Sequence, residues 1–183
     1  MSPIATPPES VMGPESAAGP EGVEGPENTP LSGAEPHYRA LESLYASAPI
    51  NLLFPSRLRV TGPGTARIEF EVDSRIYHAA GAAHGTIYFK MLDDGAFYAA
   101  NSLVSDRFLL TTAFNLLFTK PLKAGPIIAE GRWLSGKRRV YVAEARLVDG
   151  EGEEVGRGTG TFMRSTISLT SLPGYAEAGA SPA

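Results

Sequence analysis

The stretch from His84 to Asn101 constrains the fold of this chain more than any other feature. It reads His-Gly-Thr and then runs for fifteen residues, 87–101, with apolar or small side chains on all sides of a helix of 3.6 residues per turn. Its only strongly polar positions are Lys90, Asp93, Asp94 and Asn101. A helix that is apolar on every side is wrapped by other elements. We therefore expect a buried central helix.

The start of this helix has features suited to binding an anion. Gly85 and Thr86 supply an unhindered backbone and a hydroxyl where free N–H groups gather, and His84 stands beside them. Asp93 and Asp94 lie deeper in the helix, where a carboxylate is costly unless it is paired or used. They point about 100° apart around the axis, so only one can face a given substrate. An anion-friendly helix start and an isolated acid are common parts of an acyl-transfer site.

The rest of the chain predicts mainly antiparallel strands. A short amphipathic helix is expected over 37–48, ended by Pro49. Alternation and turn residues predict strands over 57–61, 65–73, 108–119, 127–134, 140–148 and 154 to about 164. In the last of these, three alternate glycines (Gly156, Gly158 and Gly160) leave one face open to close approach. One long helix is covered by such strands only if their sheet curls around it, which predicts the α+β hotdog fold.

Charge and composition exclude several classes of protein. The formal net charge is −4, and residues 1–36 hold six Glu but no Lys or Arg, leaving 16 basic and 14 acidic residues beyond them. That balance is too weak to indicate nucleic acid as a partner. There is no Cys, and the three histidines are not at helical metal-binding spacing, so we expect neither metal ion nor cofactor.

Composition also suggests the domain limits. Residues 1–36 contain eight Pro, five Gly and no aromatic residue, which predicts a disordered tail. The folded domain is expected over 37–165, followed by a C-terminal tail over 166–183. The N-terminus shows no secretory signal pattern, and no apolar run approaches membrane-spanning length. We therefore expect a soluble, cytoplasmic protein with no membrane partner.

At the central helix the chain resembles a known family. His84-Gly85-Thr86 followed by Asp93 resembles the HGG…D signature of hotdog acyl-CoA thioesterases, and its closest subgroup is the phenylacetyl-CoA thioesterases. Further landmarks agree with that pattern: Gly81, Phe118-x-x-Pro121, Ala124-Gly125 and Gly136-Lys137. The resemblance covers roughly residues 50–165. It departs at Thr86, where the family has a second glycine, and at His78, where relatives often have a water-holding Asn.

The resemblance implies a role for each matching residue. Gly85 would donate its backbone N–H to the thioester carbonyl, and Asp93 would be the general base or nucleophile. Thr111 falls where the family often has a Ser or Thr that positions water. His78 would take the place of the water-holding Asn, and the alternative is a loop histidine with no role in the site. His84 and Thr86 would shape the loop at the helix start, against the substrate.

Coenzyme A would be the leaving group of an acyl-CoA substrate. Lys120, Lys137 and Arg138 could meet its phosphates, although a solvated hairpin tip explains the last two equally well. Gly85 and Asp93 are eight residues apart, about 12 Å along a helix axis. One helix cannot place both at one carbon, which predicts a site shared by two chains in a homodimer or a dimer of dimers.

Two other functions fit parts of the sequence. Asp73 and His78 have the spacing of a hydratase motif without its Asn-Pro, and a His78–Asp93 pair loosely resembles the dyad of acyl-carrier-protein dehydratases. A hotdog hydratase or dehydratase is therefore one alternative, and a non-catalytic acyl-CoA-binding protein is another. Either Asp93 or Asp94 could also simply pair with Lys90. The aromatic residues of the central helix, Tyr88, Phe89, Phe97 and Tyr98, are expected in the core, or, for one or two of them, in the lining of an acyl pocket.

Overall fold

The structure, a computed structural model, describes residues 34–179. The expected disordered tail therefore lies outside the described residues, apart from its last three positions. The boundary expected at residue 36 falls inside the first helix, α1 (Glu35–Ser47), whose first turn contains Pro36. Proline is favoured there because the first helical N–H groups have no partner within the helix.

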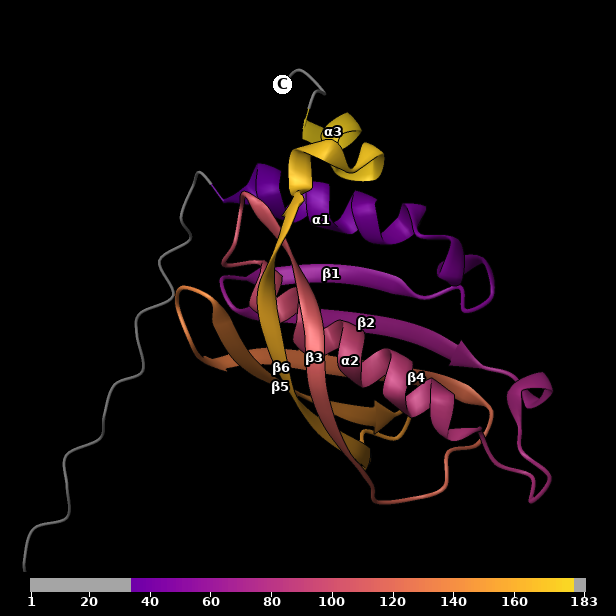
Figure 1. Ribbon diagram of the computed structural model, residues 1–183. Helices are drawn as coiled ribbons and strands as arrows, with labels where there is room; N and C mark the ends of the chain where they lie inside the picture. Colours follow the sequence, from indigo (N-terminus) through magenta and orange to yellow (C-terminus); the bar gives the residue numbers. More distant parts are fainter. Residues whose placement is uncertain (1–33, 180–183) are drawn as a thin grey trace, which may run out of the picture.

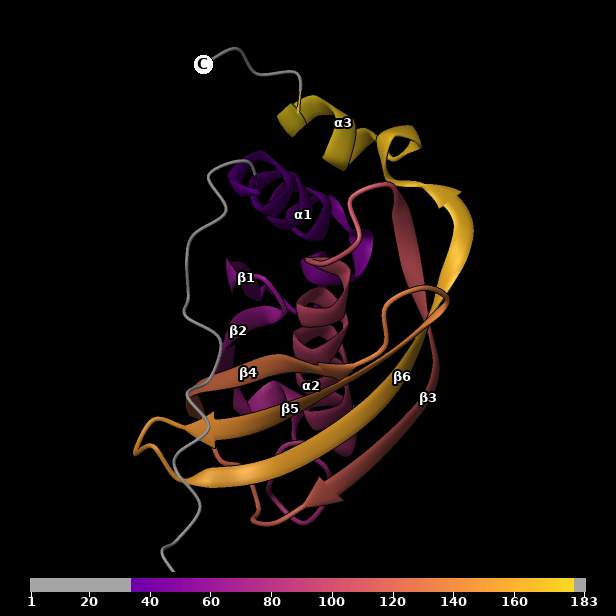
Figure 2. The same ribbon diagram turned by 90° about the vertical axis from the view of Figure 1, so that its left-hand side faces the viewer.

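Six strands form one sheet around a central helix. Along the chain α1 is followed by η1 (Pro49–Leu52), β1 (Arg57–Gly62), β2 (Thr65–Val72), η2 (Ser74–Ile76), α2 (Gly85–Asn101), β3 (Arg107–Phe118), β4 (Gly125–Ser135), β5 (Val140–Asp149), β6 (Glu154–Ser168), η3 (Leu169–Ser171) and α3 (Pro173–Gly179). The strand order is β1-β2-β4-β5-β6-β3, and all neighbours are antiparallel. The two views show the sheet curling around α2, with α1 and α3 beyond one end (Figures 1 and 2). The predicted hotdog architecture is confirmed.

Helix α2 lies directly on the sheet because two glycines meet there. A Cβ atom added to Gly131 of β4 would lie 1.9 Å from the carbonyl oxygen of Gly95. Real Cβ atoms cannot approach so closely, so the residue of β4 at this position must lack a side chain for the backbone of α2 to contact the strand. Eleven of the seventeen residues of α2 are buried by this arrangement, including Ile87, Met91, Leu92 and Ala96.

One face of α2 is not covered by the sheet. Phe89, which was expected in the core, is 45% exposed and packs edge-on against Phe114 of β3. Lys90, Asp93 and Asp94 are partly exposed on the same helix. Phe89 therefore lies outside the core of the single chain, because the curled sheet ends at β3 and leaves this side open.

The glycine face of β6 is filled by aromatic rings. Added Cβ atoms on Gly158 and Gly160 would lie 2.3 Å and 2.7 Å from the ring of Phe114, and one on Gly156 would lie 3.0 Å from Tyr88. The close approach predicted from the alternate glycines is thus confirmed. Strand β3 itself departs from the expected alternation, because its register with β6 shifts between Thr111 and Ala113. On the first half of the strand Leu110 is exposed, whereas Leu109 is fully buried, and at the far end Phe118 is exposed.

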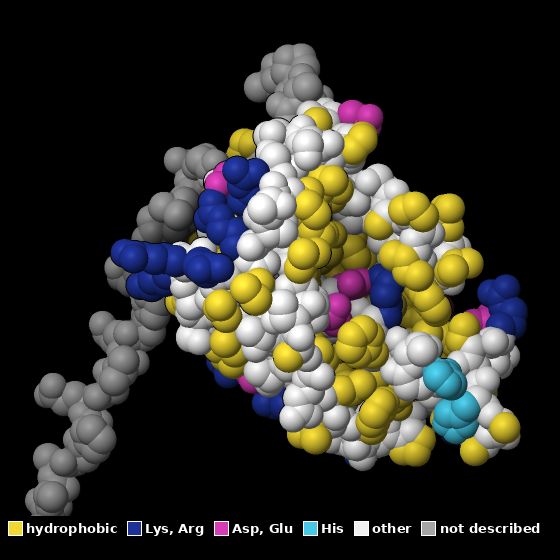
Figure 3. All heavy atoms as spheres, viewed as in Figure 1, with side chains coloured by type: hydrophobic (Ala, Val, Ile, Leu, Met, Phe, Trp, Pro, Cys, Tyr) yellow, Lys and Arg dark blue, Asp and Glu magenta, His cyan; other side chains and the backbone are white. Residues whose placement is uncertain are grey.

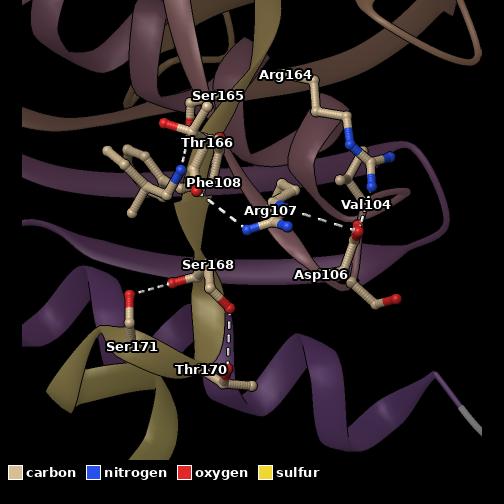
Figure 4. Close-up of polar contacts among 12 residues, drawn as sticks. Val104, Asp106, Arg107, Phe108, Arg164, Ser165, Thr166, Ser168, Thr170 and Ser171 are labelled. Carbon is tan, nitrogen blue, oxygen red and sulfur yellow. Dashed lines mark hydrogen bonds and ion pairs between the residues drawn. The ribbon is translucent and has the colours of Figure 1, made fainter.

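The C-terminal segment differs from the expected tail. Strand β6 continues to Ser168. Near its end, where its register with β3 shifts, the Ser165 hydroxyl donates to Phe108 O at 2.6 Å and accepts from Ile167 N at 3.0 Å (Figure 4). Helix α3 then packs on α1. The hydroxyl of Tyr175 lies 2.8 Å from His37 Nδ1, and an added Cβ on Gly174 would lie 2.1 Å from Ser47 Oγ. These contacts join elements far apart in sequence, which local composition cannot reveal.

The glycine contact beneath α2 makes a testable prediction. Gly131→Ala should lower the free energy of unfolding by about 1–3 kcal/mol, as overpacked substitutions do, because the new methyl group must displace α2. Gly95→Ala is the matched control: its Cβ would meet only ordinary contacts of 3.5 Å, and alanine favours the helix by up to about 1 kcal/mol. Urea unfolding of both variants measures the difference. Equal destabilisation by the two would contradict this description of the contact.

Candidate active site

Asp93 and Thr111 lie in contact on the open side of α2. Thr111 comes from β3, the strand that borders the uncovered face, and its Oγ1 donates to Asp93 Oδ1 at 3.0 Å. The second carboxylate oxygen lies 3.4 Å from the same hydroxyl. The structure thus brings together two residues that the family resemblance had connected.

The carboxyl group of Asp93 holds its proton more tightly than an ordinary aspartate. Burial raises its pKa from 3.8 to about 6, opposed chiefly by the hydrogen bond from Thr111. The charge of Asp94 raises the pKa further, and that of Lys90 lowers it. A carboxylate with a pKa near neutrality is suited to accept a proton from water and to release it again.

Asp94 has a different environment although it is the next residue. It forms an ion pair with Lys90, four residues earlier, and accepts a hydrogen bond of 3.0 Å from Tyr45 on α1. The Lys90 ammonium also donates to Asn51 Oδ1 at 2.9 Å. Burial raises the pKa of Asp94 above its usual value, and the ion pair with Lys90 and the hydrogen bond from Tyr45 offset only part of that rise. The predicted pairing of one acid with Lys90 is confirmed for Asp94, which leaves Asp93 as the acid available for chemistry.

The start of α2 leaves a backbone donor free. His84 is the N-cap: its Nδ1 accepts from Thr86 N at 3.2 Å and lies 3.1 Å from Thr86 Oγ1. Ile87 N is bonded to His84 O, whereas Gly85 N has no hydrogen-bond acceptor among residues 34–179. The positive end of the helix dipole lies at this point. The geometry therefore suits Gly85 N–H to bind a developing oxyanion.

A pocket of 440 Å³ opens beside Gly85. His78, Tyr88, Phe118 and Lys120 are among the residues that line it. Phe118 packs on the glycine so closely that an added Cβ would lie 3.2 Å from its ring. His78 is exposed, and its Nδ1 accepts from Ala80 N at 3.1 Å within the preceding loop. Lys120 forms an exposed ion pair with Glu153.

The two halves of the predicted site lie apart within one chain. Gly85, His78 and Lys120 share the pocket at the start of α2, whereas Asp93 and Thr111 are not part of its lining. Eight residues along the helix separate Gly85 from Asp93, or about 12 Å of rise. One chain therefore presents two half-sites and does not place the donor and the acid at one carbon atom.

Lys137 and Arg138 lie away from both half-sites. They are exposed in the turn between β4 and β5, which both views place far from the start of α2 (Figures 1 and 2). No ion pair holds either side chain within the described part of the chain. Their predicted contact with coenzyme A stays a prediction that requires a second chain.

The geometry does not favour the hydratase motif. Asp73 caps the short turn η2 by accepting from Arg75 N at 2.8 Å, a hydrogen bond that lowers the pKa of Asp73, and it is not bonded to His78. His78 and Asp93 belong to the separate half-sites of the chain, so they form no dyad within it.

Residues 34–179 contain no cluster of three or more His, Asp or Glu side chains that could hold a metal ion. In the same part of the chain, no helix is long and apolar enough to cross a membrane.

Comparison with known proteins places this geometry in a family context. Residues 80–156 match the family model of the thioesterase superfamily. A protein of Saccharolobus solfataricus that bears the name "Putative esterase" is 29% identical over 111 residues, which cover 60% of this chain and 74% of that protein. The matched residues of the family model run from the loop before α2 into the first residues of β6. They contain Gly85, Lys120, Asp93 and Thr111, whereas His78 lies just before them.

Solved structures agree on the fold. The Escherichia coli PaaI protein from the phenylacetic acid degradation operon superposes with a TM-score of 0.68 at 17% identity, over 74% of this chain and 97% of that one. A mutant of the phenylacetic acid degradation protein PaaI from Thermus thermophilus has a TM-score of 0.59 at 24% identity, over 64% of this chain and all of that one. The predicted resemblance to a PaaI-like hotdog thioesterase is confirmed. The superfamily match and the esterase relative support a hydrolase of the thioesterase class.

Several residues around the site were not expected from the sequence. Tyr45 was expected only as an apolar residue of the first helix, yet its hydroxyl bonds Asp94 and lies 2.5 Å from Ser56 Oγ. Asn51 reaches Lys90 from η1. The one local signal was the spacing of Lys90 and Asp94, because residues four apart on a helix are neighbours.

The raised pKa of Asp93 predicts a pH-dependent stability difference. Because the folded-state pKa of about 6 exceeds the unfolded value of 3.8, ionised Asp93 destabilises the folded state above about pH 6 and has no such effect below about pH 4. Asp93→Asn should therefore unfold at higher urea than the wild type at pH 8, by about 1–3 kcal/mol, with the gain vanishing toward pH 4.

Asp94→Asn is the matched control for this measurement. It removes the partner of the Lys90 ammonium and should lower stability at pH 8. A gain in stability for both variants, or a gain for Asp93→Asn that does not change with pH, would contradict the assigned environments.

Proposed function

We propose that the protein is an acyl-CoA thioesterase that hydrolyses a thioester to a carboxylic acid and free coenzyme A. The observation that carries the proposal is Asp93: a partly buried carboxyl group with a pKa of about 6, bonded to Thr111 and paired with no cation among residues 34–179. The adjacent Asp94 is fully engaged with Lys90 and Tyr45. Such a difference between neighbouring acids is typical of a catalytic group beside a structural one.

The proposed chemistry needs a base and an oxyanion donor. As general base, Asp93 removes a proton from the water that attacks the carbonyl, and Thr111 orients that water through its hydroxyl. As nucleophile, Asp93 attacks the carbonyl itself, and water then hydrolyses the resulting mixed anhydride to release the carboxylic acid. Gly85 N–H stabilises the negative charge that develops on the thioester oxygen, assisted by the helix dipole. The carbon–sulfur bond then breaks, and the thiolate of coenzyme A takes up a proton. His84 and Thr86 hold the helix start beside the substrate, and His78 helps to hold the water from the Gly85 side.

Two chains complete each proposed site. Gly85 and Asp93 are separated by about 12 Å along α2, so the two residues of one helix cannot both contact the same carbon atom. Strand β3 is an edge strand on which Leu110, Leu117 and Phe118 are 46%, 60% and 59% exposed. Such exposed apolar side chains support the binding of a second copy of the chain at this edge. A two-fold axis between two such chains can pair Gly85 of one with Asp93 of the other. The assembly would be a homodimer or a dimer of dimers.

The phosphates of coenzyme A are expected to meet basic side chains around the Gly85 pocket. Lys120 lines this pocket, and its ion pair with Glu153 is exposed, so it can exchange that partner for a phosphate. Lys137 and Arg138 contribute only if the partner chain brings its β4–β5 turn to the pocket. Within this proposal Lys120 is therefore the primary phosphate contact.

Substitution of the two acids tests the activity. With a panel of short, long and aromatic acyl-CoA thioesters, Asp93→Asn should lower kcat by about a hundredfold or more, because a positioned base contributes that much. Asp94→Asn should have a much smaller effect once its loss of stability is taken into account. Equal losses would overturn the assignment, and binding of acyl-CoA without any hydrolysis by the wild type would indicate a non-catalytic binder.

Complementation between chains tests the shared site. Gly85→Pro removes the N–H donor at a helix position that tolerates proline, and Asp93→Ala removes the acid. Each variant alone should be nearly inactive. A mixed dimer would contain one doubly defective and one intact site, so random pairing after co-refolding should restore about a quarter of wild-type activity. Verified mixed dimers without restored activity would rule out the shared site.

A further inference from the structure

A second cavity lies near the C-terminal end of α2, on the opposite side of Asp93 and Asp94 from the Gly85 pocket. It has a volume of 480 Å³, within the range of about 300–1,000 Å³ found for small-molecule sites. Its walls come from α1, β3, β6 and the C-terminal segment with α3, and its lining includes Leu44, Pro49, Tyr98, Phe108, Ile167 and Leu172. The apolar lining is suited to a hydrocarbon group rather than to the phosphates of coenzyme A.

Three polar side chains stand in this lining: Ser47, Tyr98 and Glu177. Ser47 donates its hydroxyl to Leu44 O and Glu177 is exposed, which leaves Tyr98 as the buried polar group without a partner in the described part of the chain. Tyr98 is only 7% exposed, and its hydroxyl makes no hydrogen bond to any residue between 34 and 179. No fully buried polar side-chain atom in that part of the chain lacks a partner, so the Tyr98 hydroxyl is not sealed inside the protein. Tyr98 is one of the residues that line the cavity. A desolvated hydroxyl of this kind is completed by a ligand atom that can hydrogen-bond.

The cavity lies further along α2 than the Asp93 half-site, and Asp93 is not part of its lining. Phe97 follows Asp93 by one helical turn, and its ring lies 5.0 Å from that of Phe108, which lines the cavity. Phe108 and Thr111 lie on the same strand. From Asp93 to Tyr98 the helix rises about 7.5 Å, in the direction away from Gly85. In Figure 3 the open face shows a hollow with charged side chains at its centre and hydrophobic side chains above, toward α1 and α3 (compare Figure 1).

We propose that this cavity binds the acyl group of the substrate, and that the acyl group is of medium length and carries a hydroxyl or keto oxygen near its far end. The inference rests on the proposed thioesterase function. The thioester carbon lies at Asp93, the acyl chain follows α2 toward its C-terminus, and the distal oxygen meets the Tyr98 hydroxyl. Helix α3 thereby becomes a wall of the substrate site, although the matched family segment ends at residue 156.

Matched pairs of thioesters test the role of Tyr98. The pairs are hexanoyl-CoA with 6-hydroxyhexanoyl-CoA and octanoyl-CoA with 8-hydroxyoctanoyl-CoA. The wild type should prefer the hydroxylated member of at least one pair in kcat/KM, and Tyr98→Phe should reduce that preference by about tenfold, the value of one hydrogen bond. Tyr38→Phe on α1, outside the cavity lining, is the control and should leave the preference unchanged.

A second variant tests the cavity itself. Ile167→Trp places a large side chain in the lining and should lower kcat/KM for the octanoyl substrates at least tenfold relative to propionyl-CoA. Leu134→Trp, equally exposed at the end of β4 and outside the lining, should leave the chain-length profile unchanged. Circular dichroism and the melting temperature establish that each variant is folded.

The outcomes separate this inference from the proposed function. The enzyme could hydrolyse thioesters with a hydroxyl preference that Tyr98→Phe does not change, or with a chain-length profile that Ile167→Trp does not change. Either result would overturn the acyl cavity and leave the thioesterase proposal intact. If no thioester is cleaved, the thioesterase proposal fails, and the same pairs then serve as stable ligands. In that case, a lower Kd for the hydroxylated member of a pair, lost in Tyr98→Phe, supports the cavity as a binding site. Equal Kd values for the two members of each pair, or no binding, overturn it.

Discussion

The approach of α2 to β4 is the constraint on which the rest of the structure depends. Because Gly131 has no side chain, the backbone of α2 at Gly95 rests directly on the sheet. This contact fixes the rotation of the helix about its axis. The residues opposite Gly95 are consequently left on the side that the sheet does not reach, where Phe89 is 45% exposed. The position of Asp93 beside β3 follows from the same rotation.

That rotation explains how two adjacent aspartates acquire different properties. A step of about 100° around the helix turns Asp94 toward α1, where Lys90 and Tyr45 bind it, and Asp93 toward Thr111 of β3. The paired acid contributes to the attachment of α1. The other acid is partly buried and has no cationic partner among the described residues, so its pKa rises to about 6. One short stretch of α2 thereby carries both a paired acid and an acid with a raised pKa.

The sequence was sufficient to predict the architecture but not the contacts between distant segments. The apolar run to Asn101 and the strand alternation predicted a helix inside a curled sheet, because periodicity is a local signal. The register shift at Thr111 and the packing of Tyr175 against His37 depend on partners far along the chain. For the site, the resemblance indicated Asp93 and Gly85. The engagement of Asp94 by Tyr45 and the cavity at Tyr98 required the three-dimensional structure.

The central claim is that two chains build one site around a single thioester. A crystal structure of the oligomer with a non-hydrolysable ketone analogue of an acyl-CoA tests it most directly. The account predicts that the ketone oxygen lies about 3 Å from Gly85 N of one chain, and that the adjacent carbon faces the Asp93 carboxylate of the other. A ketone contacted by Gly85 and Asp93 of the same chain, or one distant from Asp93 of either chain, would contradict it.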